Sequence, residues 1–317
     1  MYVRSFDPPP DLPVPLCPDL GLALQGGGAC GAFTWGVLDR LLEERRFRPA
    51  AISGASAGAL NAAVLAAGLA VGGHEAARAG LEALWRGVAD MAFLKMMGAP
   101  GVHLQMDLMT RLVSPYQFNP LNINPLRDLL AGLIDFGSLG GRGRPALFIS
   151  ATNVRTGAPR IFRETEITVD VLLASTCLPY LHHAVEIDGE SYWDGGFSAN
   201  PPLLPLALDT LCGALLLVKL TPDSEEEVPT QAQPILARMR RIMFNAPLER
   251  DLDALAGMQA QLRRTTRRLP RDLVRLRALG LSTIAMPAEL LGEDAGSAGL
   301  IERLRTAGRA AAEGMLQ

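Results

Sequence analysis

The chain alternates short runs of consecutive apolar residues with longer stretches in which apolar residues recur every three or four positions. The short runs predict strands, several of them buried on both faces, and the longer stretches predict helices. Strands are predicted over residues 20–25, 50–53, 146–154, 159–163 and 213–221. Helices are predicted over residues 32–44, 74–88, 124–136, 169–176, 234–278 and 297–315. This pattern predicts an α/β fold.

Residues 52–73 contain no charged residue, and a hydropathy window alone would identify them as a membrane span. However, the stretch contains Ser53, Ser56, Asn61 and several glycines, and no belt of aromatic residues flanks it. We therefore expect a helix that is buried on all sides in the core of a soluble protein.

Three regions differ in character. Residues 1–18 form a proline-rich arm with no apolar run of signal-peptide length, residues 19–221 the core, and residues 222–317 a helical region packed on that core. Within residues 234–278, leucines recur at seven-residue steps and most arginines lie on other faces, so we expect an amphipathic helix that packs on the core. Peripheral contact of this arginine-rich segment with an anionic membrane surface is the alternative.

The composition fits a globular protein: 49% of the 317 residues are hydrophobic and 20% are charged. The net charge of −3 gives no reason to expect a nucleic-acid partner. The four cysteines are scattered, with no Cys-x-x-Cys motif and no paired histidine spacing, so no metal site is expected. Free thiols indicate a reducing compartment, and we expect a cytoplasmic location.

The sequence Gly54-Ala55-Ser56-Ala57-Gly58 follows a predicted buried strand and precedes an alanine-rich helix. It has the Gly-x-Ser-x-Gly pattern of a nucleophile elbow, a sharp turn that exposes a serine at a helix N-terminus. The alternative is a small-residue helix start with Ser56 as its N-cap. The motif alone does not distinguish a catalytic serine from an N-cap serine, so residues elsewhere in the chain have to decide between the two.

A glycine loop, Gly26-Gly27-Gly28-Ala29-Cys30-Gly31, follows the first predicted strand and opens a helix. Its free N–H groups and the helix dipole favour an anion. The loop satisfies the dinucleotide pattern Gly-x-Gly-x-x-Gly, but the next strand ends in the elbow and not in the acidic residue that ribose binding requires. An oxyanion hole for the elbow serine is the preferred interpretation, and a nucleotide-binding oxidoreductase is the alternative.

Two further segments bear on the chemistry. Residues 91–122 are rich in Met, Gly and Pro and are expected to form either a lid or wall of an acyl pocket or an ordinary irregular loop. All four histidines precede Asp194, which excludes the Ser–Asp–His order of α/β hydrolases. A serine nucleophile still needs a base, and a desolvated carboxylate can serve.

Four blocks in this order resemble the patatin-like phospholipases: the glycine loop, the elbow, Ala174-Ser175-Thr176-Cys177-Leu178-Pro179, and Asp194-Gly195-Gly196. The resemblance covers roughly residues 19–221. One departure is Cys30, where many members of the family carry a basic residue. The C-terminal region shows no resemblance to a known family.

The resemblance implies a three-layer α/β/α sandwich with a mostly parallel central sheet, here followed by a helical C-terminal extension. It implies a serine acyl hydrolase acting on fatty-acyl esters of lipids or phospholipids, with Ser56 and Asp194 as a catalytic dyad and no cofactor. It places the oxyanion hole at Gly26, Gly27, Gly28 and Ala29. The glycines that complete these motifs and support their turns are Gly31, Gly54, Gly58, Gly195 and Gly196. A lipid-binding or scaffold protein with a degenerate site is a further alternative.

Overall fold

The computed structural model describes residues 19–91, 113–222, 224–225, 227–292 and 299–316. The proline-rich arm, residues 1–18, lies outside the described residues. So does most of the segment that was expected to form a lid or an ordinary loop, since only its two ends are described.

An eight-stranded sheet organises the molecule, in the order β5-β6-β3-β2-β1-β7-β8, with β4 paired to β3. The five strands β3, β2, β1, β7 and β8 are mutually parallel, whereas β4, β5 and β6 pair antiparallel. The strands are β1 (Leu20–Leu24), β2 (Pro49–Ala55), β3 (Ala146–Asn153), β4 (Pro159–Arg163), β5 (Val185–Ile187), β6 (Glu190–Asp194), β7 (Ala214–Lys219) and β8 (Gly280–Ala285). The hairpin β5–β6 was not predicted, because it carries no apolar run.

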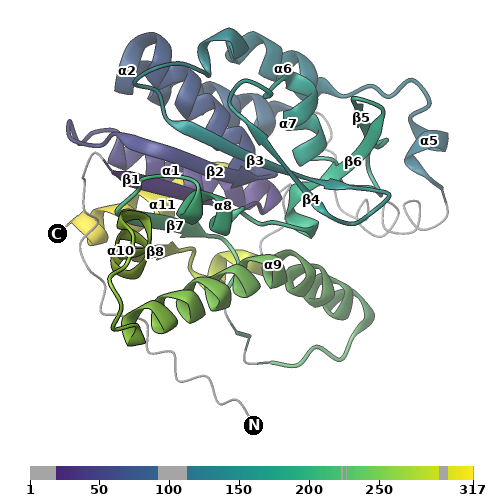
Figure 1. Cartoon of the computed structure of the whole chain (residues 1–317). Coiled ribbons are helices and arrows are strands. Elements are labelled where there is room, and N and C mark those ends of the chain that lie inside the picture. The colour runs from purple at the N-terminus through teal and green to yellow at the C-terminus, as the bar shows by residue number, and fades with distance from the viewer. Residues whose placement is uncertain (1–18, 92–112, 223, 226, 293–298, 317) are drawn as a thin grey trace.

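Helices cover both faces because successive strand residues point to opposite sides. In β1, Leu22 and Leu24 join one buried apolar cluster and Ala23 joins the other. Figure 1 shows α2, α6 and α7 above the strands and α9 below them. The first layer contains α1 (Gly31–Leu41), α2 (Ala57–Asp90), α6 (Pro125–Leu133), α7 (Val169–Ser175) and α11 (Leu300–Leu316), and the second contains α8 (Leu203–Leu208), α9 (Ala232–Arg264) and α10 (Arg271–Ala278). The predicted α/β/α sandwich is confirmed.

The charge-free stretch forms the end of β2 and the first half of α2, and residues 57–67 of this helix are buried. By length and composition α2 could cross a membrane, but 61% of its most apolar window is buried inside the protein. Gly72 and Gly73 leave the helical conformation, which explains why the sequence predicts a separate helix from residue 74. The expectation of a helix buried on all sides is confirmed for residues 57–67, but it is wrong for residues 68–73, which are partly or fully exposed.

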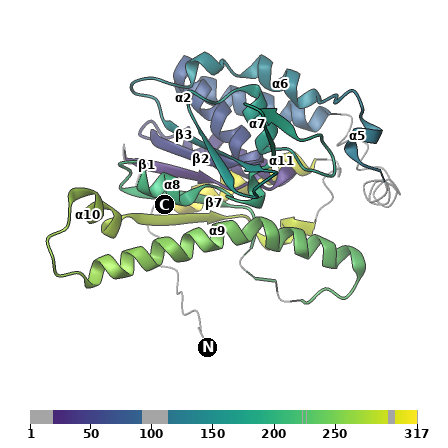
Figure 2. The same cartoon turned by 45° about the vertical axis from the view of Figure 1, so that its right-hand side comes forward.

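The C-terminal region is not purely helical, which corrects the prediction. Strand β8 pairs parallel with β7 and extends the sheet, and α11 packs on α1. As an edge strand, β8 is largely exposed, so it lacks the apolar run by which buried strands are found. The predicted helix over 234–278 is two helices, since α9 ends at Arg264 and α10 begins only after Pro270, its N-cap. Figure 2 shows α9 along one side of the sheet.

Candidate active site

Ser56 occupies a strained turn between β2 and α2. Its backbone has φ 52° and ψ −127°, in the left-handed region that residues with a side chain seldom adopt. The N–H of Ser56 donates to Ser175 Oγ at 2.9 Å, which ties the turn to the end of α7. Strain of this kind persists only where the surroundings hold it, and it concentrates at functional sites.

The two elbow glycines allow three backbones to meet at Ser56. A Cβ on Gly58 would overlap the carbonyl oxygen of Leu24 in β1, and one on Gly54 would lie 2.5 Å from the Gly58 carbonyl oxygen. Any larger residue would therefore push α2 away from the sheet. The Gly-x-Ser-x-Gly spacing is thus explained by close packing around this turn.

Asp194 ends β6 and is completely buried. Its Oδ1 accepts a hydrogen bond of 2.7 Å from the Gly196 N–H. Burial raises the pKa of Asp194 to about 7, and this effect outweighs the lowering by the Gly196 N–H and by the nearby Ser56 side chain. Its Oδ2 has no hydrogen-bond partner among the described residues, so the contact with Ser56 lacks full hydrogen-bond geometry. The structure therefore brings Ser56 and Asp194 together and leaves one carboxylate oxygen unsatisfied beside the serine.

The glycines after Asp194 allow the same kind of close approach. A Cβ on Gly195 would overlap the Ser150 carbonyl oxygen of β3, and one on Gly196 would lie 2.5 Å from the Phe244 ring of α9. The carboxylate loop is thus wedged between the sheet and α9.

The glycine loop lies directly against the elbow, since a Cβ on Gly26 would lie 2.7 Å from Ser56 Cβ. The prediction that Gly26 is an oxyanion donor is wrong in this structure, because its N–H donates to Asn200 Oδ1 at 2.7 Å and is buried. The N–H groups of Gly27, Gly28 and Ala29 have no acceptor within the described part of the chain. Gly28 has φ +58°, which turns the backbone at this point.

The cysteine and histidine side chains described next are less suited to catalysis than the Ser56 hydroxyl group. Burial raises the pKa of Cys30 to about 11, and burial together with Asp194 raises that of Cys177 to about 12, so both thiols are protonated at neutral pH. His183 stacks on Tyr116 with ring centroids 4.0 Å apart. In the described residues, no group of three or more His, Cys, Asp or Glu side chains is arranged to hold a metal ion.

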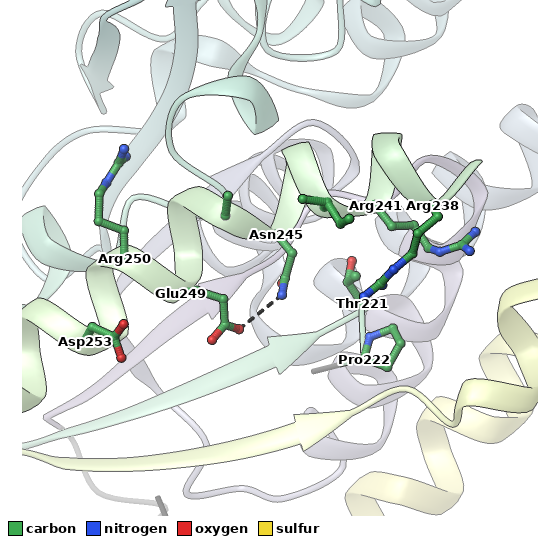
Figure 3. Close-up of a pocket in the computed structure, with 10 residues that line it drawn as sticks. Thr221, Pro222, Arg238, Arg241, Asn245, Glu249, Arg250 and Asp253 are labelled. Carbon is green, nitrogen blue, oxygen red and sulfur yellow. Dashed lines mark hydrogen bonds between the residues drawn. The ribbon is translucent and has the colours of Figure 1, made fainter. Parts of the chain in front are cut away.

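A groove of about 470 Å³ runs beside α9 and past the end of β7 (Figure 3). Its lining includes Thr221, Arg238, Asn245 and Arg250, but neither Ser56 nor Asp194. Asn245 connects the groove with the glycine loop, because its Oδ1 accepts a hydrogen bond from the side chain of Gln25, the residue before that loop. Neither Gln25 nor Asn245 was a candidate at the sequence level, since a lone amide carries no motif.

The family model for patatin-like phospholipases matches residues 22–207, more than half of the chain. The chain belongs to the patatin-like phospholipase family, and at the level of that family it is a lipid acyl hydrolase. The family assignment favours the hydrolase over the nucleotide-binding alternative. No curated protein matches the chain.

Two solved structures resemble the chain at 16% sequence identity. VipD from Legionella pneumophila gives a TM-score of 0.45, covering 94% of this chain and 67% of VipD. Full-length ExoU from the type III secretion system of Pseudomonas aeruginosa, in complex with full-length SpcU, gives a TM-score of 0.37, covering 95% of this chain. The chain spans 53% of the length of ExoU.

Proposed function

We propose that the protein cleaves fatty-acyl esters of lipids or phospholipids, with Ser56 as nucleophile and Asp194 as general base. The observation that carries this proposal is the completely buried carboxyl group beside a serine in a strained turn. With a pKa of about 7, Asp194 is ionised in a useful fraction near neutral pH yet basic enough to accept a proton. Such matching of pKa to pH is typical of a catalytic base.

The reaction follows from these positions. Asp194 removes the Ser56 hydroxyl proton as the oxygen attacks the ester carbonyl carbon, and the carbonyl oxygen becomes an oxyanion. The N–H groups of Gly27 and Gly28, with that of Ala29, stabilise the oxyanion. The intermediate collapses, the alcohol leaves with the proton from Asp194, and water then attacks the acyl-serine by the same route. The mechanism uses no metal ion and no organic cofactor.

Peripheral membrane contact, which the sequence suggested for residues 234–278, is proposed for a narrower surface. Four apolar side chains spaced at helical intervals are 39–51% exposed on the first half of α9: Ile235, Met239, Ile242 and Met243. Arginines lie between them, and a face that combines apolar side chains with arginine fits the headgroup region of a bilayer. We propose a cytoplasmic protein that touches a membrane through this face.

Fluorophosphonate labelling with intact-mass detection tests the nucleophile. The wild-type protein should gain one label and Ser56→Ala none, with loss of hydrolysis of short acyl esters. Ser53→Ala is a matched control, since Ser53 is a buried serine of β2, three residues before Ser56, and its Oγ has no described partner. A wild-type protein that neither labels nor hydrolyses esters would favour the degenerate lipid-binding alternative. Undiminished turnover by Ser56→Ala would remove Ser56 from the mechanism.

A further inference from the structure

One turn of α9, at Phe244 and Asn245, is linked by hydrogen bonds to the start of the glycine loop: Asn245 bonds the Gln25 side chain, and Phe244 reaches Gly26 through Asn200. This turn lies outside residues 22–207, the part of the chain that matches the family model. The C-terminal region therefore reaches the core at the place where the proposed mechanism needs the most accurate geometry.

The first contact runs through Gln25, a completely buried polar residue between β1 and the loop. Its Oε1 accepts from the N–H groups of Leu220 and Thr221, at 2.6 and 3.0 Å. Its Nε2 donates to Asn245 Oδ1 at 3.1 Å. The Gln25 side chain thus joins three elements: the loop, the segment that follows β7, and α9.

Asn245 is held in turn by charged neighbours. Its Nδ2 donates to Glu249 Oε1 at 3.1 Å, and the same carboxylate oxygen accepts from the buried Lys219 Nζ at 2.7 Å. Figure 3 shows Asn245 and Glu249 on α9 joined by this hydrogen bond. The Glu249 contact fixes which amide atom of Asn245 faces Gln25, because only the NH₂ group can donate to a carboxylate.

The second contact runs through Asn200. Its Nδ2 donates to the Phe244 carbonyl oxygen at 2.8 Å, while its Oδ1 accepts from the Gly26 N–H at 2.7 Å. Gln25 and Gly26 are therefore both fixed from α9, and the next residues are the ones with free N–H groups. The direction in which those N–H groups point therefore depends on where Gln25 and Gly26 are held.

We propose that Asn245 is a positioning residue for the oxyanion loop, acting through Gln25 and assisted by the Asn200 link from the adjacent Phe244. This inference rests on the proposed function, since it concerns the loop that stabilises the oxyanion. The oxyanion exists only in the transition state, so a misdirected loop lowers kcat and leaves KM little changed. A displacement of about 1 Å can cost a hundredfold in rate.

The test compares Asn245→Ala with Gln259→Ala. Gln259 lies on the same helix and donates through Nε2 to the Leu276 and Leu279 carbonyl oxygens, so its loss also removes side-chain hydrogen bonds but none that leads to the loop. Turnover is expressed per active site counted by fluorophosphonate labelling, so an unfolded fraction does not lower it. We expect Asn245→Ala to lose about ten- to a hundredfold in kcat with KM nearly unchanged, and Gln259→Ala to keep wild-type kcat.

Asn245→Asp separates positioning from packing. The aspartate still accepts from Gln25 Nε2, but a contact between two carboxylates replaces its bond to Glu249, and Lys219 offsets only part of that repulsion. Because the acceptor for Gln25 is kept, we expect Asn245→Asp to recover part of the kcat that alanine loses. Wild-type kcat in Asn245→Ala, an effect confined to KM, or equal kcat losses in the alanine and aspartate variants would each overturn the inference.

The two proposals fail in different ways. If Ser56→Ala stays active, or if wild type neither labels nor hydrolyses esters, the proposed function fails and this inference with it. If Ser56→Ala is inactive while Asn245→Ala retains full kcat, only the positioning role is overturned.

Discussion

Replacing Asp194 by asparagine should inactivate the enzyme and also stabilise it at neutral and alkaline pH. Burial is the largest influence on this carboxyl group and raises its pKa from 3.8 to about 7, although the Gly196 N–H and the Ser56 side chain lower it. An amide keeps the acceptor for the Gly196 N–H but carries no charge, so it avoids the desolvation of the carboxylate. Activity and stability should therefore change in opposite directions.

The magnitude follows from proton linkage. Between the ordinary pKa of 3.8 and the folded-state pKa of about 7, the folded chain binds a proton that the unfolded chain has released. The free energy of unfolding therefore falls as pH rises through this window. A difference of about 3 pKa units corresponds to ~4 kcal/mol, which is lost in full above pH 7 and not at all below the ordinary pKa. The asparagine side chain does not titrate, so the variant would not suffer this loss.

Urea unfolding at pH 5 and pH 8 measures the effect, together with turnover of a short acyl ester. Asp194→Asn should exceed wild type by up to ~4 kcal/mol at pH 8 and by less at pH 5, while kcat falls about a hundred- to ten-thousandfold. Wild-type kcat/KM should decrease as pH drops below about 7 and the base is protonated. Asp188→Asn, an exposed change in the same hairpin, is the control. A variant no more stable than wild type at pH 8 would refute the reasoning.

Three further predictions concern other parts of the molecule. Gly28→Ala should fold, because no atom lies within 4 Å of the new Cβ. A side chain is unfavourable at the φ of +58°, so the loop N–H groups should turn away from the oxyanion and kcat per labelled site should fall about a hundredfold or more. Asp39→Asn should lower the free energy of unfolding, measured in urea, by about 3 kcal/mol, since the buried carboxylate binds Arg78, Arg305 and Arg309. Burial raises the pKa of Asp39 but these bonds lower it more, so the stability difference between wild type and variant should shrink as the pH falls below the ordinary pKa of an aspartate. Met239→Glu should weaken sedimentation with anionic vesicles and spare turnover of soluble esters, whereas Val274→Glu, on α10, should not; equal binding by both would count against the α9 face.

Much of this protein is determined by residues that are neighbours in the sequence. The strands of the parallel core are found from apolar runs because a strand buried on both faces has to be apolar along its whole length. The elbow and the glycine loop are also local, since a sharp turn at Ser56 requires small residues within two positions on either side. The role expected for Asp194 came from family resemblance, as an Asp-Gly-Gly turn by itself is a common surface feature.

Only the tertiary structure decides which groups meet. It places Asp194, at the end of β6, beside Ser56, in the turn after β2, and it buries the carboxyl group completely. This burial, not the local sequence, raises the carboxyl pKa. It also removes Gly26 from the set of oxyanion donors, because Asn200, distant in the sequence, accepts its N–H. Strand β8 and the Gln25–Asn245 bond escaped prediction for the same reason: an exposed edge strand and a single buried amide leave no periodic signal, and their partners are chosen by packing between distant segments.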